Sequence, residues 1–99
     1  MTTQQAIAAI SQDLYRVANG YFKGSDKMAS VFLDSATLTR KQLIKDKIPT
    51  YIQTILEKFT ENNQVLTREH IAENFLLWSL LLQNYAKKIN TPDSDSAIH

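Results

Sequence analysis

The amino-acid sequence predicts an all-α protein, an antiparallel four-helix bundle with short connections and a flexible C-terminal tail. Four segments carry apolar residues at spacings of three and four, which is the repeat of one helix face. No segment shows the alternation of a strand, and the 99 residues include only 2 Gly and 2 Pro. Because short connections favour antiparallel neighbours, we expect one bundle domain over residues 1–90 and a flexible tail over residues 91–99.

The first two helices are predicted on either side of a glycine-containing turn. The first should span about Thr3–Asn19. Asn19-Gly20 and then Gly24 are its stop signals, because glycine tolerates the left-handed conformation that ends helices. Ser25-Asp26 should cap the second helix, which we expect to reach about Lys45. A break near Thr37–Thr39 is left open, because β-branched residues mildly disfavour a helix.

The last two helices have clearer start signals. Pro49 suits the first turn of the third helix, where its missing N–H costs nothing. Thr67 is the predicted N-cap of the fourth helix, with Leu66 and Ile71 placed to form a hydrophobic staple. The fourth helix then carries one apolar seam, made of Ile71, Phe75, Trp78, Leu82, Tyr85 and Ile89. Pro92 is the signal that ends this helix.

The fourth helix is more apolar than one seam requires. Phe75–Leu82 places seven large apolar side chains in eight positions, so the segment is apolar on nearly every side. It is much shorter than the roughly 20 residues that span a bilayer. We assign Phe75, Trp78 and Leu82 to the core, with a partner anchor as the alternative role of Trp78. The seam leaves four leucines unexplained, Leu76, Leu77, Leu80 and Leu81. Leu77 and Leu81, one turn apart, are the more doubtful pair, either covered by the other helices or part of a partner surface.

The sequence offers no chemistry of an enzyme. It lacks cysteine, a glycine-rich phosphate loop, a nucleophile elbow and a two-histidine metal motif, so we expect no catalytic residue, cofactor or metal. His70 lies between Glu69 and Glu73, but it is rotated by about 100° from Glu69 on the helix. We interpret these three residues as a polar first turn.

Positive charge is concentrated near the end of the second helix, in Arg40, Lys41, Lys45 and Lys47, although the net charge is only +1. This cluster is either a solvated helix end or a docking site for an anionic membrane surface or an acidic protein face. Without interleaved aromatic residues it is a poor nucleic-acid signature, and we expect no nucleic-acid partner.

The order of these features resembles the enterocin A immunity family, small proteins that protect producers of pediocin-like bacteriocins. The matching features are Leu14-Tyr15 in the first helix, the basic stretch Arg40–Lys45, the Pro-led segment Ile48–Ile52 and the entry Leu66-Thr67 into the last helix. The resemblance implies a non-enzymatic bundle in the cytoplasm. It also implies binding to the mannose phosphotransferase permease, a membrane receptor, when bacteriocin engages it. Specificity would depend on the C-terminal half, here Thr67–His99.

The two lines of reasoning give one set of candidate partner-binding residues: Arg40, Lys41, Lys45, Lys47, Leu77, Trp78, Leu81, Lys87 and Lys88. We expect a cytoplasmic protein, partly associated with the membrane, and favour a monomer. The alternative hypothesis is a non-enzymatic adaptor or homo-oligomerising module that uses the apolar fourth helix as its interface.

Overall fold

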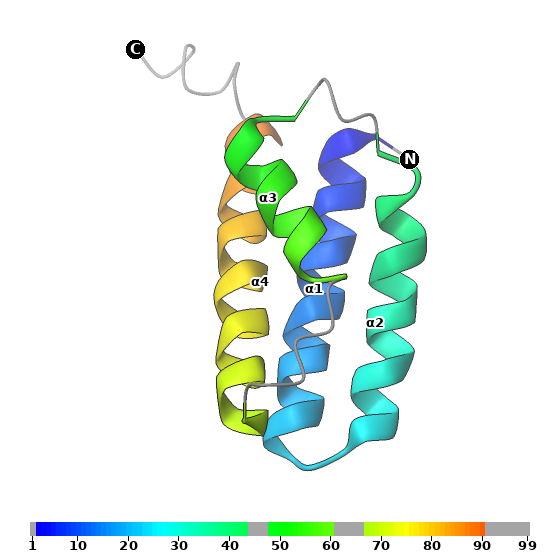
Figure 1. Cartoon of the computed structure of the whole chain (residues 1–99). Coiled ribbons are helices and arrows are strands. Elements are labelled where there is room, and N and C mark those ends of the chain that lie inside the picture. The colour runs from blue at the N-terminus through cyan, green and yellow to red at the C-terminus, as the bar shows by residue number, and fades with distance from the viewer. Residues whose placement is uncertain (1, 44–47, 61–66, 91–99) are drawn as a thin grey trace.

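The structure, a computed structural model, describes residues 2–43, 48–60 and 67–90. Within these ranges it contains four helices and no strand: α1 (Thr3–Phe22), α2 (Asp26–Arg40), α3 (Thr50–Lys58) and α4 (Arg68–Asn90) (Figure 1). The all-α prediction is therefore confirmed for this part of the chain. The predicted tail at residues 91–99 and the staple residue Leu66 lie outside the described residues.

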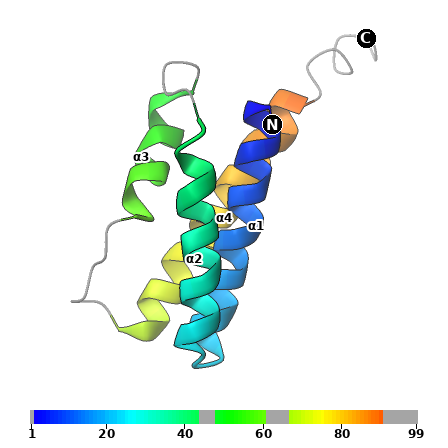
Figure 2. The same cartoon turned by 90° about the vertical axis from the view of Figure 1, so that its right-hand side faces the viewer.

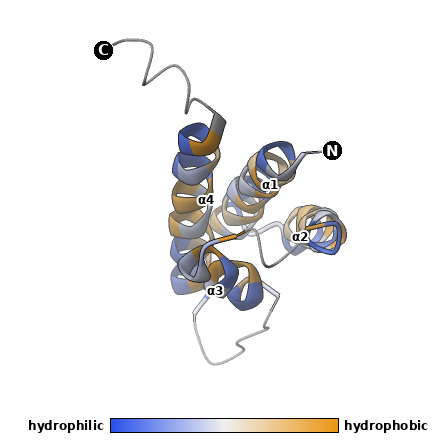
Figure 3. Cartoon of the chain, turned by 90° about the horizontal axis from the view of Figure 1, so that it is seen from above, coloured by the Kyte–Doolittle hydropathy of each residue, from blue (hydrophilic) through white to orange (hydrophobic). Residues whose placement is uncertain are grey.

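Helix α1 is the central element of the fold. It packs against both α4 and α2. Seen from above, α1 lies between these two helices, and the shorter α3 lies across from it (Figure 3). The first residues of α1 and the last of α4 lie at the same end of the molecule (Figure 2).

The first helix extends further than the sequence predicts. Thr2 and Gln5 form a capping box at its start, because the Thr2 hydroxyl accepts from the Gln5 amide and the Gln5 side chain accepts from the Thr2 amide. The predicted stop at Asn19-Gly20 is wrong, since the helix runs on to Phe22. Gly24 adopts the expected left-handed conformation, with φ of 76°.

Gly20 allows two helices to pack closely and does not end a helix. A Cβ atom placed on Gly20 would lie 2.8 Å from the backbone nitrogen of Ala29 and 3.1 Å from the carbonyl oxygen of Ser25. The start of α2 therefore approaches α1 at a point where a side chain does not fit. Sequence reasoning assigned this glycine to a turn because it weighed conformation alone.

The second helix ends earlier than predicted. It begins after Ser25, whose hydroxyl accepts from the Met28 amide, and it ends at Arg40 and not near Lys45. It is unbroken at Thr37 and Thr39, whose hydroxyls donate to the carbonyl oxygens one turn before, at 2.9 and 3.1 Å. These bonds let threonine remain inside a helix.

The starts of α3 and α4 follow the sequence signals. Pro49 is the residue immediately before α3, and its carbonyl oxygen accepts the first bonds of the helix. Thr67 precedes α4, and its hydroxyl accepts from the His70 amide at 3.3 Å. This is the N-cap bond that was expected at Thr67.

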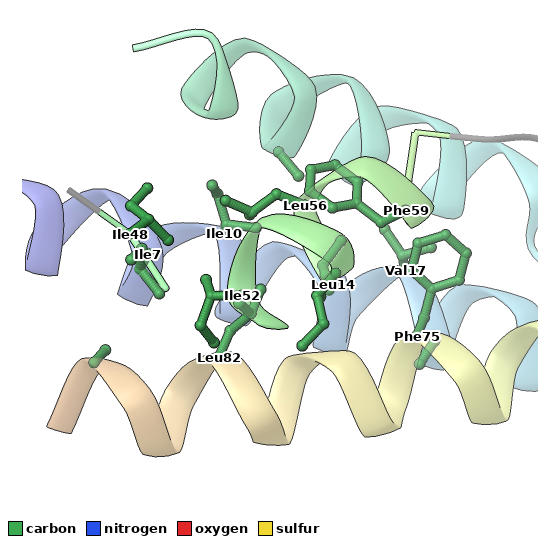
Figure 4. Packing of buried hydrophobic residues seen from close by; sticks show 14 of the residues in the cluster. Ile7, Ile10, Leu14, Val17, Ile48, Ile52, Leu56, Phe59, Phe75 and Leu82 are labelled. Carbon is green, nitrogen blue, oxygen red and sulfur yellow. The ribbon is translucent and has the colours of Figure 1, made fainter. Parts of the chain in front are cut away.

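The core is formed where α1, α3 and α4 face one another. Ile52, Leu56 and Phe59, at or next to α3, lie over side chains of α1 and α4 (Figure 4). The largest fully buried side chains are apolar, namely Phe59, Ile7, Ile10, Leu14, Ile52, Leu82 and Val17. Burial of each contributes roughly 1.5–3 kcal/mol of transfer free energy. The predicted core positions Phe75 and Leu82 are both buried.

Candidate functional site

The exposed side of α4 carries an apolar strip. Leu77, Leu80 and Leu81 remain 53%, 48% and 38% exposed, and we call these three side chains the leucine face. They lie on the side of α4 opposite Phe75 and Leu82, which are buried. Among the apolar residues outside the seam, Leu76 packs against the core, whereas the leucine face does not fill it. Three clustered leucines on a solvated face are typical of a protein–protein contact.

Trp78 belongs mainly to the interior side of α4. It is partly buried against the core, and its ring meets that of Phe75 edge to face at a centroid distance of 5.2 Å. Phe75 also stacks on Tyr21 of α1 at 6.0 Å. This aromatic row links α1 to α4 and leaves only part of Trp78 accessible to a partner.

Basic residues from distant parts of the sequence lie at one end of the molecule. The C-terminal ends of α2 and α4 lie at the same end of the molecule (Figure 1), on opposite sides of α1 (Figure 3). Arg40 and Lys41 belong to the end of α2, and Lys87 and Lys88 to the last turn of α4. Positive charge there also suits the negative ends of the two helix dipoles. Lys45 and Lys47, the other two cations of the predicted cluster, lie outside the described residues.

Arg40 is less exposed than a solvated helix end would require. Its Nε atom is buried and has no hydrogen-bond partner in the described part of the chain. It lines a small cavity of about 20 Å³ together with Leu43, Ile48, Gln53, Leu56 and Glu57. That volume fits one water molecule, which is a suitable acceptor for Nε. Arg40 therefore anchors the end of α2 near α3, while Lys41 is exposed.

A shallow polar groove runs along the surface where α1 and α4 meet. It has a volume of about 430 Å³ and is lined by Ser11, Gln12, Tyr15, Arg16, Asn19, Ser79 and Gln83. The hydroxyls of Ser11 and Ser79 each donate to the carbonyl oxygen three residues before, at 2.7 Å. Both serines are buried and already paired, so they allow the two helices to approach without leaving an unsatisfied polar group.

Two of the four tyrosines lie largely at the surface. Tyr15 and Tyr51 are 51% and 56% exposed. Tyr51 meets the half-buried Tyr85 edge to face at 6.3 Å, which connects α3 to α4. Burial, and then the neighbouring Tyr51, raise the pKa of Tyr85 above its ordinary value.

Two arginines connect helices of the described part of the chain. Arg68 at the start of α4 donates two hydrogen bonds to the carboxylate of Asp26 at the start of α2, at 2.5 and 3.4 Å. These bonds and the Asp26 charge raise the pKa of Arg68 above its ordinary value. Arg16 lies over the ring of Phe32 at 5.2 Å and thereby links α1 to α2.

The described residues contain no cluster of three or more histidine and carboxylate side chains able to hold a metal ion. The Nδ1 atom of His70 lies 2.9 Å from the Thr67 hydroxyl, so this histidine belongs to the helix start. None of the described helices is long and apolar enough to cross a membrane.

Together these features define a small helical protein with an exposed leucine face on α4 and basic residues at one end. No family model, curated protein or solved structure matches the chain. Sequence reasoning singled out Leu77 and Leu81 correctly as the doubtful core positions. It also left Leu80 unexplained by the seam but did not include it among the candidate partner-binding residues, although the helical repeat places Leu80 beside them.

Proposed function

We propose that this protein is a non-enzymatic bacteriocin immunity protein whose four helices form an antiparallel bundle. In this proposal it acts in the cytoplasm, partly at the membrane surface. There it binds the membrane receptor, a mannose phosphotransferase permease, that a pediocin-like bacteriocin has engaged. The proposal starts from the family resemblance of the helix order and of the basic and Pro-led segments.

The observation that carries the proposal is the combination of a basic end with an apolar surface on one helix. Lys87 and Lys88 of α4, together with Lys41 at the end of α2, are suited to an anionic membrane surface, where each cation contributes about 1 kcal/mol of attraction. The leucine face lies about two to three turns before Lys88 on the same helix. In the proposal, the lysines orient the protein at the membrane while Leu77, Leu81 and the accessible part of Trp78 contact the receptor.

Protection of a sensitive cell tests the proposal directly. The chain is expressed in a sensitive lactic-acid bacterium, which is challenged with a panel of pediocin-like peptides. We expect protection against at least one peptide, and loss of that protection when both Leu77 and Leu81 are replaced by Glu. Val31→Glu is the matched control, because Val31 is similarly exposed, at 55%, but lies on α2. Absence of protection against the whole panel, at normal protein levels, would count against immunity.

The second candidate is an adaptor or homo-oligomerising module without a role in toxin resistance. The exposed leucine face favours it, because such a surface serves any protein–protein contact. A binding measurement separates the two candidate functions. An interaction module binds its partner when the receptor and the bacteriocin are both absent.

A further inference from the structure

The exposed side of α4 carries two leucines at its midpoint and opposite charges at equal distances from it. The midpoint is the peptide bond between Leu80 and Leu81. Moving outward by equal steps along the helix, Leu77 corresponds to Asn84 and Glu73 corresponds to Lys88. At 100° per residue all six side chains fall on one side of the helix, and all six are exposed.

We propose that this side of α4 binds the same side of α4 in a second copy of the chain, with the two helices antiparallel. The inference deepens the interaction-module candidate and rests on it, but it does not require the immunity function. In an isologous contact about a two-fold axis, residues equally distant from the midpoint meet across the interface. Leu80 and Leu81 of one copy therefore meet Leu81 and Leu80 of the other.

Charge complementarity favours a second copy of the chain as the partner of this side of α4. In the antiparallel register, Glu73 of each copy lies opposite Lys88 of the other, so each dimer contains this pair twice. In a parallel register Glu73 would meet Glu73 and Lys88 would meet Lys88, and like charges would repel. Within the described part of the chain neither Glu73 nor Lys88 forms an ion pair, so both are available for this contact.

The expected dimer is weak. A single helix from each copy, with three partly buried leucines, gives an interface at the small end of specific contacts. We expect a dissociation constant of roughly 10 µM to 1 mM. Dilute protein is then mainly monomeric, as the sequence analysis favours, and the leucine face becomes covered only at high local concentration.

Sedimentation equilibrium of the full chain tests the inference, at protein concentrations from about 5 µM to about 2 mM, a range that brackets the expected constant. We expect a monomer–dimer equilibrium that disappears in Leu81→Glu. Leu80→Gln is a milder second variant. Both residues are exposed, so unfolding curves should be unchanged and a loss of dimer would not reflect misfolding.

Charge reversal tests the register. Glu73→Lys and Lys88→Glu should each weaken self-association by about tenfold or more, because attraction becomes repulsion at two symmetric positions. An equimolar mixture of the two single variants should restore the dimer, since both cross-pairs are again of opposite charge. Lys27→Glu and Asp34→Lys, exposed on α2, are the matched controls and should change nothing.

Three results would overturn the inference. The first is a monomer at every concentration, the second a dimer that survives Leu81→Glu, and the third a mixture of charge variants that associates no better than either variant alone. If the protein stays monomeric but still protects cells from a bacteriocin, the self-association fails while the immunity proposal stands.

Discussion

Replacing Gly20 by alanine separates two physical effects that predict opposite signs. In an exposed helix interior, Gly→Ala stabilises by about 0.5–1 kcal/mol, because alanine loses less conformational entropy on folding. At Gly20, however, the new Cβ would lie 2.8 Å from the Ala29 nitrogen and 3.2 Å from the Ala29 Cα. Real Cβ atoms essentially never come as close as the first of these, so α2 must move away from α1.

The cost of that movement exceeds the gain in helix propensity. Overpacking of a close contact costs typically about 1–3 kcal/mol. We therefore expect Gly20→Ala to lower the free energy of unfolding by about 1–2 kcal/mol, and the melting temperature by roughly 5–10 °C for a domain of this size. Because the near atoms belong to the backbone, adding Ala29→Gly should not rescue the variant.

Urea and thermal unfolding followed by far-ultraviolet circular dichroism measure this change. Ser30→Ala is the control, because Ser30 is exposed in α2 and should show only the gain in propensity, a few tenths of a kcal/mol. If Gly20→Ala were as stable as the unmodified protein or more stable, the close approach of α1 and α2 inferred at this residue would be wrong.

Three further predictions concern the core, a helix cap and an ion pair. Leu82→Ala should lower the free energy of unfolding in urea by about 2–5 kcal/mol, because Leu82 is fully buried. Leu81→Ala should lower it by less than about 0.5 kcal/mol. Similar losses at both positions would contradict the assignment of the leucine face. Thr67→Ala should cost about 1 kcal/mol of stability through loss of the α4 cap, and Thr67→Ser should recover most of it; an equal loss in both variants would show that the hydroxyl does not cap. A double-mutant cycle on Asp26 and Arg68 should give about 0.2–1 kcal/mol at low salt and less at high salt, since both side chains are solvated; a coupling that salt does not change would argue against a surface ion pair.

The elements of the fold could be predicted well from local signals, and the packing between them less well. Thr67 and Pro49 act within a few residues of themselves, so their roles are legible in the sequence. Gly20 was misassigned because its role depends on Ala29, on another helix. The early end of α2 at Arg40 likewise follows no clear stop signal in the sequence.

The candidate site was predictable only in part, for the same reason. The helical repeat indicated that Leu77 and Leu81 had no place on the α4 seam, but only the arrangement of the other helices decides whether they are covered. Tyr51 is next to Ile52 and Ile55 on the apolar side that the sequence predicts for the third helix, yet it is 56% exposed. Lys41 and Lys88 belong to helix ends that lie at the same end of the molecule, which is a property of the fold that no sequence window contains.

The division of α4 into a buried side and the leucine face bears on how such a protein changes over evolution. If the leucine face binds a partner as proposed, substitutions at Leu77, Leu80 or Leu81 would alter binding and leave the residues that hold α4 to α1 and α3 untouched. Selection for folding and selection for a binding partner would then act on different positions of a single helix. A new specificity would arise by single substitutions, without a stabilising mutation elsewhere to compensate.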